Sequence, residues 1–413
     1  MSDRKLAFVY SPEIEAFSYP ADCPFKTQRA GQTRGRLASF GLLGSPDRLE
    51  LPPRKATRAE LERLHTPRYL DELQRAAAGE LTPAGFQMGL GGMDTPVFKD
   101  MYEYGAWACG AGLTAAELLL AKEADIVFNL LGGFHHAHAE HAGGFCFLND
   151  VALACHRLAA AGKRVACVDV DAHHGDGTQD FFYRRNDVLT ISMHESGKTL
   201  YPWGGFENEI GEGPGEGFNV NIPLPAETYD EAFLHAYRAI IPPLLKAYSP
   251  DVIVVELGMD ILAGDPLTHL MMTNNVVAEL AQQLLSLGKP LLIAGGGGYH
   301  IEHTVRGWAL AWRTFAGEGD TDLYSLGLGG VMLGSTEWAG GLQDHQLPVT
   351  AEQRQRVDAE LDATLRAVRQ NTFKYHGLET QPADGGRAAG CGSHLLDTQT
   401  PQTTKPEVAN ALL

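Results

Sequence analysis

The stretch Val165-Ala-Cys-Val-Asp-Val170-Asp-Ala-His-His-Gly-Asp176 decides the fold class of this 413-residue chain and indicates its chemistry. It begins as a short apolar run, typical of a strand that is buried on both faces of a parallel sheet. It ends in polar side chains that alternate with small apolar ones, so on an extended backbone Asp169, Asp171 and His173 point to the same face. This spacing favours metal ligands. The alternative is a helix N-cap Asp beside a surface His.

Similar apolar runs recur along the chain, with helical patterns between them. The predicted strands cover residues 6–10, 125–131, 165–170, 188–193, 252–257 and 291–294. The predicted helices cover residues 57–65, 101–122, 149–161, 230–247, 274–287 and 302–315, and the first opens with the capping box Thr57-Arg-Ala-Glu60. This alternation indicates an α/β fold with a mostly parallel central sheet that helices cover on both faces.

The domain organisation follows from where these patterns stop. No linker composition interrupts residues 1–375, which we expect to form a single domain. Residues 376–413 are rich in Gln, Thr, Pro, Gly and Ala and show no apolar periodicity, so they are predicted to be a disordered C-terminal tail.

The composition limits the partners and the compartment. The chain has 51 acidic and 33 basic residues and a formal charge of -18, which disfavours nucleic acids and acidic membranes and favours cationic partners. Its six cysteines form no C-x-x-C pair and predict free thiols in a reducing compartment. The first apolar run is too short for a signal peptide, and no stretch approaches a membrane span. We therefore expect a cytoplasmic protein.

Polar clusters follow four of the predicted strands. They are Gly132-Gly-Phe-His-His136, Asp169-Val-Asp-Ala-His-His-Gly-Asp176, Gly258-Met-Asp260 with Asp265 beyond it, and Gly295-Gly-Gly-Gly-Tyr299. The carboxyl ends of parallel strands form the edge where α/β proteins bind ligands, so the four clusters predict one site. Asp171, His173 and a carboxylate from elsewhere suit a catalytic zinc ion. The spacing leaves open whether that carboxylate is Asp260 or Asp265.

Two of these clusters allow a second interpretation. The adjacent pair His135 and His136 is typical either of a polar loop or of residues that move protons near neutral pH, with Asp169 and Asp176 free to orient one imidazole each. The glycine run before Tyr299 lacks the Lys-Ser/Thr pair of a phosphate-binding loop. It predicts either a tight turn before a core aromatic or a strip that brings the tyrosine hydroxyl to an oxyanion.

Taken together, four motifs resemble the signature segments of histone deacetylases. They are residues 133–137, Gly144-Phe-Cys-Phe-Leu-Asn149-Asp, residues 168–177 and Gly295-Gly-Gly-Gly-Tyr299. The similarity extends in register from about Phe8 to Trp312 and is greatest to class I enzymes and bacterial acetoin-utilisation-type deacetylases. It implies an arginase-like fold and the hydrolysis of acetyl or other short acyl amides of lysine side chains.

The resemblance also implies roles for individual residues. Zinc, or Fe²⁺ in its place, would be held by Asp171, His173 and Asp265 rather than Asp260. His136 would transfer protons with His135 as its electrostatic partner, and Asp176 and Asp169 would support them. Tyr299 would bind the oxyanion. A structural potassium ion would take oxygens from Asp169, Asp171, His173, Ser192 and Met193.

The substrate side of the implied site is an acyl-lysine tunnel. Gly144, Phe145 and Tyr201 would form its wall, and Asp94 would be the carboxylate at its rim. Arg29 would lie in an inner product channel, and Met272, in the register that places Asp265 on the metal, would lie at the tunnel mouth. An acyl-lysine protein or peptide, or a small acylated amine, would then be the partner.

Three residues depart from the family pattern. Glu256 stands where many relatives have Gln, and His138 and His141 enrich the loop after the His pair.

An acetylpolyamine amidohydrolase is the main alternative function. A non-catalytic acyl-amine binding protein would lack a ligand or Tyr299, and a dinuclear ureohydrolase would need an Asp-x-Asp that residues 256–260 do not contain.

Overall fold

The computed structural model describes residues 4–318 and 342–380. These residues belong to one compact unit that extends to Thr380. Of the predicted C-terminal tail, residues 381–413 lie outside the described residues. The end of the domain at residue 375 therefore stays a prediction, although the described chain continues through a short 3-10 helix at Phe373–His376.

The core of the protein is an eight-stranded sheet whose strands follow the order β2-β1-β3-β8-β7-β4-β5-β6. All seven strand pairs are parallel. The strands are β1 (Leu6–Val9), β2 (Arg48–Leu51), β3 (Ile126–Asn129), β4 (Val165–Asp169), β5 (Val188–Glu195), β6 (Asn219–Leu224), β7 (Val252–Glu256) and β8 (Leu291–Ala294). The six predicted strands are confirmed. Their runs of Val, Ile and Leu are buried, as expected of strands that are covered on both faces of a parallel sheet.

The two strands that the sequence pattern did not predict lie at the edges of the sheet. Strand β2 is only four residues long, and its sequence Arg-Leu-Glu-Leu is partly exposed. Strand β6 contains two Asn residues and Pro223. An edge strand pairs on one side only, so it tolerates polar residues and a proline that would interrupt a central strand.

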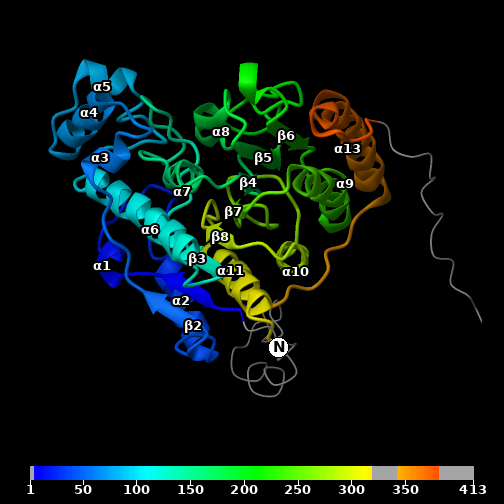
Figure 1. Ribbon diagram of the computed structural model, residues 1–413, viewed down its shortest axis with the longest axis horizontal. Helices are drawn as coiled ribbons and strands as arrows, with labels where there is room; N and C mark the ends of the chain where they lie inside the picture. The colour runs from blue at the N-terminus through cyan, green and yellow to red at the C-terminus, as the bar shows by residue number, and fades with distance from the viewer. Residues whose placement is uncertain (1–3, 319–341, 381–413) are drawn as a thin grey trace, which may run out of the picture. The chain divides into compact units, whose positions relative to one another are not determined.

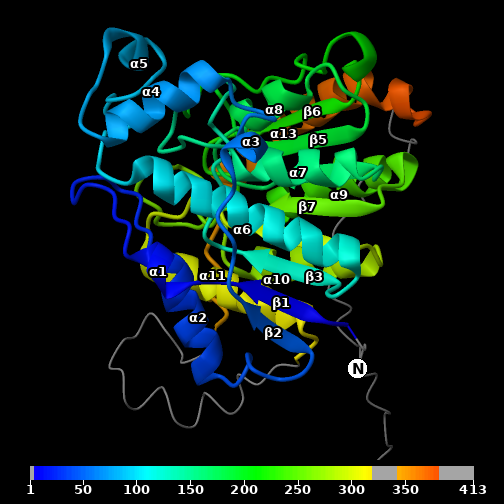
Figure 2. The same ribbon diagram turned by 60° about the vertical axis from the view of Figure 1, so that its left-hand side comes forward.

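Helices cover both faces of the sheet (Figures 1 and 2). On one face, α6 (Met101–Ala121) contacts β1, β3 and β8, and α7 (Asp150–Ala160) contacts β4 and β7. Helices α9 (Asp230–Tyr248), α10 (Asn275–Ser286) and α11 (Ile301–Phe315) lie on the other face. There the buried Trp312 ring meets the rings of Phe8 and Phe128 edge-on, which joins α11 to β1 and β3.

The remaining helices are shorter or lie at the periphery. They are α1 (Pro12–Glu15), α2 (Arg29–Ser39), α3 (Arg58–Leu61), α4 (Pro67–Ala77), α5 (Pro83–Gln87), α8 (Asp176–Phe182) and α13 (Ala351–Thr372), with a 3-10 turn at Gly213–Gly215. The capping box of Thr57 and Glu60 is present at the start of α3. Helix α13, which the sequence analysis did not predict, packs against α9 and β6.

The strand order brings the four predicted polar clusters together. They follow β3, β4, β7 and β8, and these four strands are consecutive in the sheet in the order β3-β8-β7-β4. Because the strands are parallel, their carboxyl ends share one edge. The sheet itself thus places all four clusters side by side.

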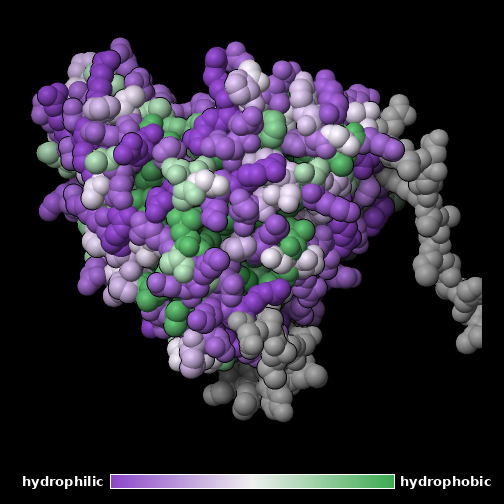
Figure 3. Space-filling model, viewed as in Figure 1, coloured by the Kyte–Doolittle hydropathy of each residue, from purple (hydrophilic) through white to green (hydrophobic). Residues whose placement is uncertain are grey.

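The visible surface is mainly hydrophilic, and its hydrophobic residues occur in small groups (Figure 3). Among the described residues, no helix combines the length and the apolar character that crossing a lipid bilayer requires. The five cysteines at positions 23, 109, 146, 155 and 167 are buried free thiols, as predicted for the described part of the chain.

Candidate active site

The side chains best placed to hold a metal ion come from two neighbouring strand ends. Asp171 and His173 follow β4, and Asp260 follows β7. One ligand atom from each of the three lies within 4.8 Å of the others. His173 Nδ1 is 2.9 Å from Asp260 Oδ2 and 3.3 Å from Asp171 Oδ1. Imidazole nitrogen and carboxylate oxygen are donors that zinc accepts, and three protein ligands leave a fourth position open, as in catalytic zinc sites.

The charges of this group fit a divalent cation. Asp171 and Asp260 are fully buried. Burial and the neighbouring Asp171 raise the pKa of Asp260 to about 7. Burial by itself would lower the pKa of His173, but the hydrogen bonds to Asp171 and Asp260 outweigh it and raise that pKa to about 10. A metal ion would take the place of these protons, since its ligands bind in their deprotonated forms.

Asp265, the third ligand that the family resemblance implies, lies close to this group, because its charge and those of Asp260 and His173 act on one another. Asp265 Oδ2 accepts the backbone N–H of Tyr299 at 2.7 Å, and Asp265 Oδ1 accepts that of Leu267 at 2.9 Å. Asp171 and Asp260 accept backbone N–H groups in the same way, from Gly297 and Ala172. The role of Asp265 as the third metal ligand stays a prediction, and Asp260 is the alternative carboxylate.

A second group of possible ligands surrounds Glu256. Its atoms and those of His135 and Asp171 also lie within 4.8 Å of one another. Both carboxyl oxygens of Glu256 are buried and make no hydrogen bond, and burial raises the pKa of this group well above its ordinary value. The ring nitrogens of His135 already face Asp169 and His136. Because the Glu256 carboxyl is neutral and both ring nitrogens of His135 already have partners, this group is the poorer candidate for a metal site.

The two adjacent histidines face the metal-ligand group and are each oriented by a carboxylate. His135 Nδ1 is 2.8 Å from Asp169 Oδ2, and His136 Nδ1 is 2.7 Å from Asp176 Oδ1. The Nε2 atoms of the two rings are 3.2 Å apart. The His136 ring lies 5.9 Å from the His173 ring, centroid to centroid. The pairing of each imidazole with its carboxylate is the one predicted from the sequence.

Their environments give the two imidazoles opposite protonation states. Burial and the neighbouring His135 lower the pKa of His136 to about 4. Burial also acts against a charge on His135, but Asp169, Glu256 and Asp171 outweigh it and raise the pKa of His135 well above 6.5. At neutral pH His136 is the imidazole that can accept a proton, and it lies beside a positively charged His135.

Tyr299 lies next to the metal-ligand group at the end of the glycine strip. Its ring centroid is 6.3 Å from that of His173 and 5.8 Å from that of Phe145. Burial and the nearby Asp260 raise the pKa of the Tyr299 hydroxyl well above 10, so it stays a hydrogen-bond donor. Gly296 has φ +135°, and a Cβ there would come within 2.8 Å of Asp171 Oδ2, so only glycine fits this close approach.

Arg29 supports the glycine strip from inside the protein. Its Nη1 donates to the Gly298 carbonyl at 2.8 Å, and its guanidinium carbon lies 4.5 Å from the Phe25 ring and 5.1 Å from the Trp308 ring. Burial lowers the pKa of Arg29 from its ordinary value, although Tyr299 and the carboxylates of the site partly oppose this change. A buried cation is thus held behind Tyr299, and the place of Arg29 in a product channel stays a prediction.

The predicted wall residues flank His136 and Tyr299. The Tyr201 ring lies 5.1 Å from the His136 ring. Gly144 has φ +50°, and a Cβ there would lie 2.3 Å from His136 Cδ2, so any side chain would collide with the imidazole. Asp94, the predicted rim carboxylate, accepts the Gly144 N–H through Oδ2 at 2.9 Å and the Phe145 N–H through its carbonyl at 2.8 Å. Asp94 therefore fixes the wall loop.

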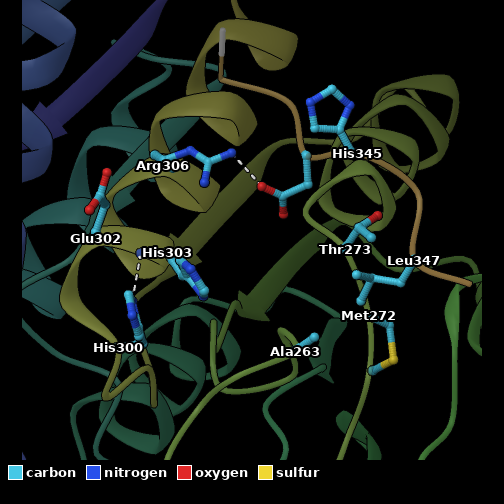
Figure 4. A pocket seen from close by; sticks show the side chains of 10 residues that line it. Ala263, Met272, Thr273, His300, Glu302, His303, Arg306, His345 and Leu347 are labelled. Carbon is cyan, nitrogen blue, oxygen red and sulfur yellow. Dashed lines mark hydrogen bonds and ion pairs between the residues drawn. The ribbon is translucent and has the colours of Figure 1, made fainter. Parts of the chain in front are cut away.

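Met272, which the resemblance places at the tunnel mouth, is 1% exposed in the structure. It lines a cavity of about 520 Å³ together with residues such as His300, His303 and Arg306 at the start of α11 (Figure 4). Its place at the mouth of a substrate tunnel stays a prediction.

The residues predicted to hold potassium lie together on neighbouring strands. Asp169 is paired with Ser192 in the register of β4 and β5. Asp169 Oδ1 accepts the N–H of Asp171 at 3.0 Å, and Ser192 Oγ is 2.8 Å from His194 Nδ1. Met193 follows Ser192 in β5 and is fully buried. Their role as potassium ligands stays a prediction.

Sequence reasoning missed one contact of the site. His138 was noted only as a departure, and Asp180 was not singled out. His138 Nε2 is 3.3 Å from Asp176 Oδ2, and His138 Nδ1 is 2.6 Å from Asp180 Oδ2. The available signal was the spacing of Asp176 and Asp180, four residues apart at the start of a helix, which puts both carboxylates on one face.

Comparisons with known proteins agree with this geometry. The Histone deacetylase domain family matches residues 23–315. The acetoin utilization protein AcuC of Bacillus subtilis is 39% identical over 323 residues, which cover 76% of this chain and 83% of that protein. Histone deacetylase 8 of Xenopus tropicalis is 35% identical over 283 residues, which cover 68% of this chain and 76% of that protein.

Two solved structures are similar along almost the whole described chain. A crystal structure of an HDAC homolog from Aquifex aeolicus has a TM-score of 0.76 at 28% identity, covering 88% of this chain and 100% of that one. An HDAC homolog complexed with SAHA has a TM-score of 0.77 at 28% identity and the same coverage. These neighbours have the arginase-like fold, which confirms the predicted fold class.

Proposed function

The chain belongs to the histone deacetylase family of hydrolases, and from this premise we propose that it uses zinc to remove acetyl or other short acyl groups from lysine side chains. The observation that carries the proposal is the buried group of Asp171, His173 and Asp260 beside a neutral His136. A metal ligand group, a proton acceptor and a tyrosine donor within one site are what hydrolysis of an amide requires.

In this proposal Asp171 and His173 hold the metal ion together with Asp265, the carboxylate that the resemblance implies. Asp260, which lies 2.9 Å from His173 Nδ1, is the alternative third ligand. A zinc ion bound there would polarise the amide carbonyl and lower the pKa of a bound water. Fe²⁺ accepts the same oxygen and nitrogen donors, so it is the alternative metal. A structural potassium ion held by Asp169, Asp171, His173, Ser192 and Met193 is part of the same proposal, supported by the closeness of Asp169 and Ser192.

His136 would do the proton chemistry. Its low pKa keeps it neutral, so it can accept a proton from the attacking water through Nε2, while Nδ1 stays bound to Asp176. The same Nε2 can then protonate the leaving amine. The positive charge on His135, held by Asp169, favours the developing negative charge on the attacked carbonyl.

Tyr299 would complete the stabilisation of that charge. Its hydroxyl stays protonated, and its backbone N–H is anchored to Asp265, so the donor is held before the substrate arrives. Phe145 and Tyr201, which flank Tyr299 and His136, would enclose the apolar lysine stem and exclude water.

The substrate alternative is an acetylated polyamine. The resemblance places Met272 at the tunnel mouth, where polyamine-selective relatives have a carboxylate. The thioether of Met272 offers no charged partner to a second ammonium group, which favours acyl-lysine.

A kinetic assay on an acetyl-lysine peptide tests the proposal. Purified protein loaded with Zn²⁺ should release acetate and the free amine, and the rate should disappear with a chelator and return with added metal. Asp171→Ala and His173→Ala should lose both bound metal and activity. Full activity of a preparation shown to be metal-free would overturn the metal-dependent mechanism, and binding of the peptide without turnover would favour a non-catalytic acyl-amine binding protein.

The partners and the location that we propose rest on the net charge, the free thiols and the similarity to bacterial relatives. The acidic net charge of -18 favours cationic, lysine-containing substrates over nucleic acids or acidic membranes. We propose a cytoplasmic enzyme, supported by the buried free thiols of the described chain and by similarity to bacterial acetoin-utilisation proteins.

A further inference from the structure

Trp203, close to the candidate site in the chain, has an unusual backbone and an exposed ring. Its φ of +67° is a left-handed conformation that is rare for a bulky side chain. Trp203 is also 64% exposed, although an aromatic ring of this size stabilises a fold when it is buried. Neither feature stabilises the folded chain. Backbone strain of this kind is concentrated at positions that serve function.

The chain leads from the proposed tunnel wall to Trp203 within two residues. Leu200 is buried, Tyr201 is half-buried and Trp203 is exposed. The Tyr201 ring lies 5.1 Å from the ring of His136, and its hydroxyl lies against Gly143, because a Cβ there would come within 2.8 Å of it. The Trp203 N–H donates to the Leu200 carbonyl at 3.2 Å and closes a turn. Trp203 therefore lies where the segment of the proposed wall reaches solvent.

The segment that carries Trp203, residues 196–207, folds back on itself. A Cβ on Gly197 would come within 2.4 Å of the Gly204 carbonyl oxygen, so the two arms of the segment are in direct contact. Such close contact of two backbones fixes the shape of the turn between them.

Contacts from β5 and α13 hold the same segment from outside. His194 Nε2 of β5 donates to the Gly205 carbonyl at 3.0 Å. Asn371 Nδ2 of α13 donates to the Glu207 carbonyl at 2.8 Å. These contacts are made by residues other than Trp203, so the segment keeps its shape without packing of that ring. The ring is thus presented to solvent on a fixed support.

Exposed hydrophobic residues gather in the segments that border the site. The described chain has seven large hydrophobic residues that are exposed, and four of them lie in the segments that carry the predicted rim and wall residues: Leu81, Phe86, Met93 and Trp203. Met93 precedes Asp94, which binds the Gly144 N–H at 2.9 Å. Single exposed hydrophobic residues are common, whereas a group of them around a site is typical of a contact surface.

We propose that Trp203 is a specificity-determining residue of the deacylase site, which packs its ring on the polypeptide next to an acyl-lysine and favours peptides over free acylated amines. The inference rests on the proposed function and adds the part of the substrate that this residue meets. A ring held in place before binding loses little conformational freedom on contact, so its packing contributes to affinity. A free acylated amine lacks the flanking chain that the ring would contact.

The experiment compares kcat/KM on a peptide with acetyl-lysine at its centre and on acetyl-lysine that is blocked at both termini, with zinc-loaded protein. Trp203→Gly suits the left-handed backbone and removes the ring. It should lower the ratio of the two values about 5–10-fold, mainly through KM on the peptide. Trp203→Phe should restore most of the wild-type ratio. Phe40→Ala, which removes an exposed ring after the end of α2, is the matched control and should leave the ratio in place.

Thermal unfolding of the same proteins gives a second measurement. Because glycine adopts φ +67° without strain, Trp203→Gly should unfold at the same temperature as the wild type or at a higher one. A lower unfolding temperature would give the ring a role in the fold and overturn the inference. If Trp203→Gly does not fold, Trp203→Asn removes the ring with a residue that also tolerates this backbone.

The outcomes separate this inference from the proposed function. An active wild type whose ratio is unchanged in Trp203→Gly would overturn the role of Trp203 and leave the proposed function in place. A wild type that is inactive on both substrates would contradict the proposed function itself.

Discussion

The backbone N–H of Tyr299 donates to the Asp265 carboxylate across 2.7 Å, which makes Asp265 an anchor for the tyrosine. The second carboxylate oxygen holds Leu267, so Asp265 joins the loop after β7 to the glycine strip after β8. Asp260, five residues earlier, lies 2.9 Å from His173 Nδ1. Two aspartates of one loop therefore border Asp171 and His173, and either carboxylate can complete a metal-ligand group.

The first prediction separates these two aspartates. Asp265→Asn should lose most of the bound zinc and all measurable deacylation, because one anionic ligand is gone. Asp260→Asn retains the oxygen that accepts the Ala172 N–H and should keep its zinc. Metal analysis of the purified proteins and steady-state kinetics measure both effects. Zinc lost from Asp260→Asn and retained in Asp265→Asn would make Asp260 the third ligand instead.

The second prediction concerns the hydroxyl of Tyr299. Tyr299→Phe removes the donor and keeps the ring contact with Phe145, so zinc content should stay the same while kcat falls on the order of 10²-fold. Phe145→Leu is a useful companion variant, since it alters the wall without touching the donor and should act mainly on KM. An unchanged kcat in Tyr299→Phe would remove this residue from the oxyanion role.

The third prediction uses His65, a buried imidazole outside the metal group. Its Nδ1 faces the His138 carbonyl at 2.9 Å, and its Nε2 accepts the Asn149 N–H at 3.1 Å. Burial lowers the pKa of His65 to about 4, because a proton on Nε2 would confront the Asn149 N–H. The unfolded chain therefore binds a proton that the folded protein excludes.

Because of His65, the folded protein should become less stable as the pH is lowered. Between the unfolded pKa of about 6.5 and the folded pKa of about 4, the free energy of unfolding falls as the pH is lowered. From pH 7 to pH 5 the His65 contribution should amount to about 2 kcal/mol. Urea unfolding at both pH values should show a smaller difference for His65→Gln than for wild type. An equal difference in the two proteins would contradict this account.

The fourth prediction decides between acyl-lysine and acetylpolyamine substrates. The wild type should hydrolyse an acetyl-lysine peptide with a higher kcat/KM than acetylspermidine. Met272→Glu would place a carboxylate at the proposed tunnel mouth and should shift this ratio toward the polyamine by about 1–2 kcal/mol. Met272→Gln, which adds no charge, is the matched control and should leave the ratio in place. A wild type that already prefers acetylspermidine would establish the polyamine alternative.

Local sequence patterns were sufficient for the central part of the fold. The strands around residues 126–129, 165–169, 252–256 and 291–294 are short apolar runs, and such runs can be buried only inside a parallel sheet. The polar clusters directly after them could be assigned to one sheet edge, because parallel strands share the direction of their ends. The sequence also indicated that Asp169 and Asp176 orient one imidazole each. The family resemblance implied that Asp169 pairs with His135 and Asp176 with His136.

Only the tertiary structure decided what each carboxylate of the loop after β7 contacts and what surrounds the proton acceptor. Asp260 and Asp265 have the same side chain and lie on one loop, and the two turns between them direct one toward His173 and the other toward Tyr299. His138 meets Asp180 only because a loop after β3 packs against a helix after β4. Such contacts depend on the path of the backbone between segments far apart in the chain, and a local pattern of residues carries no record of that path.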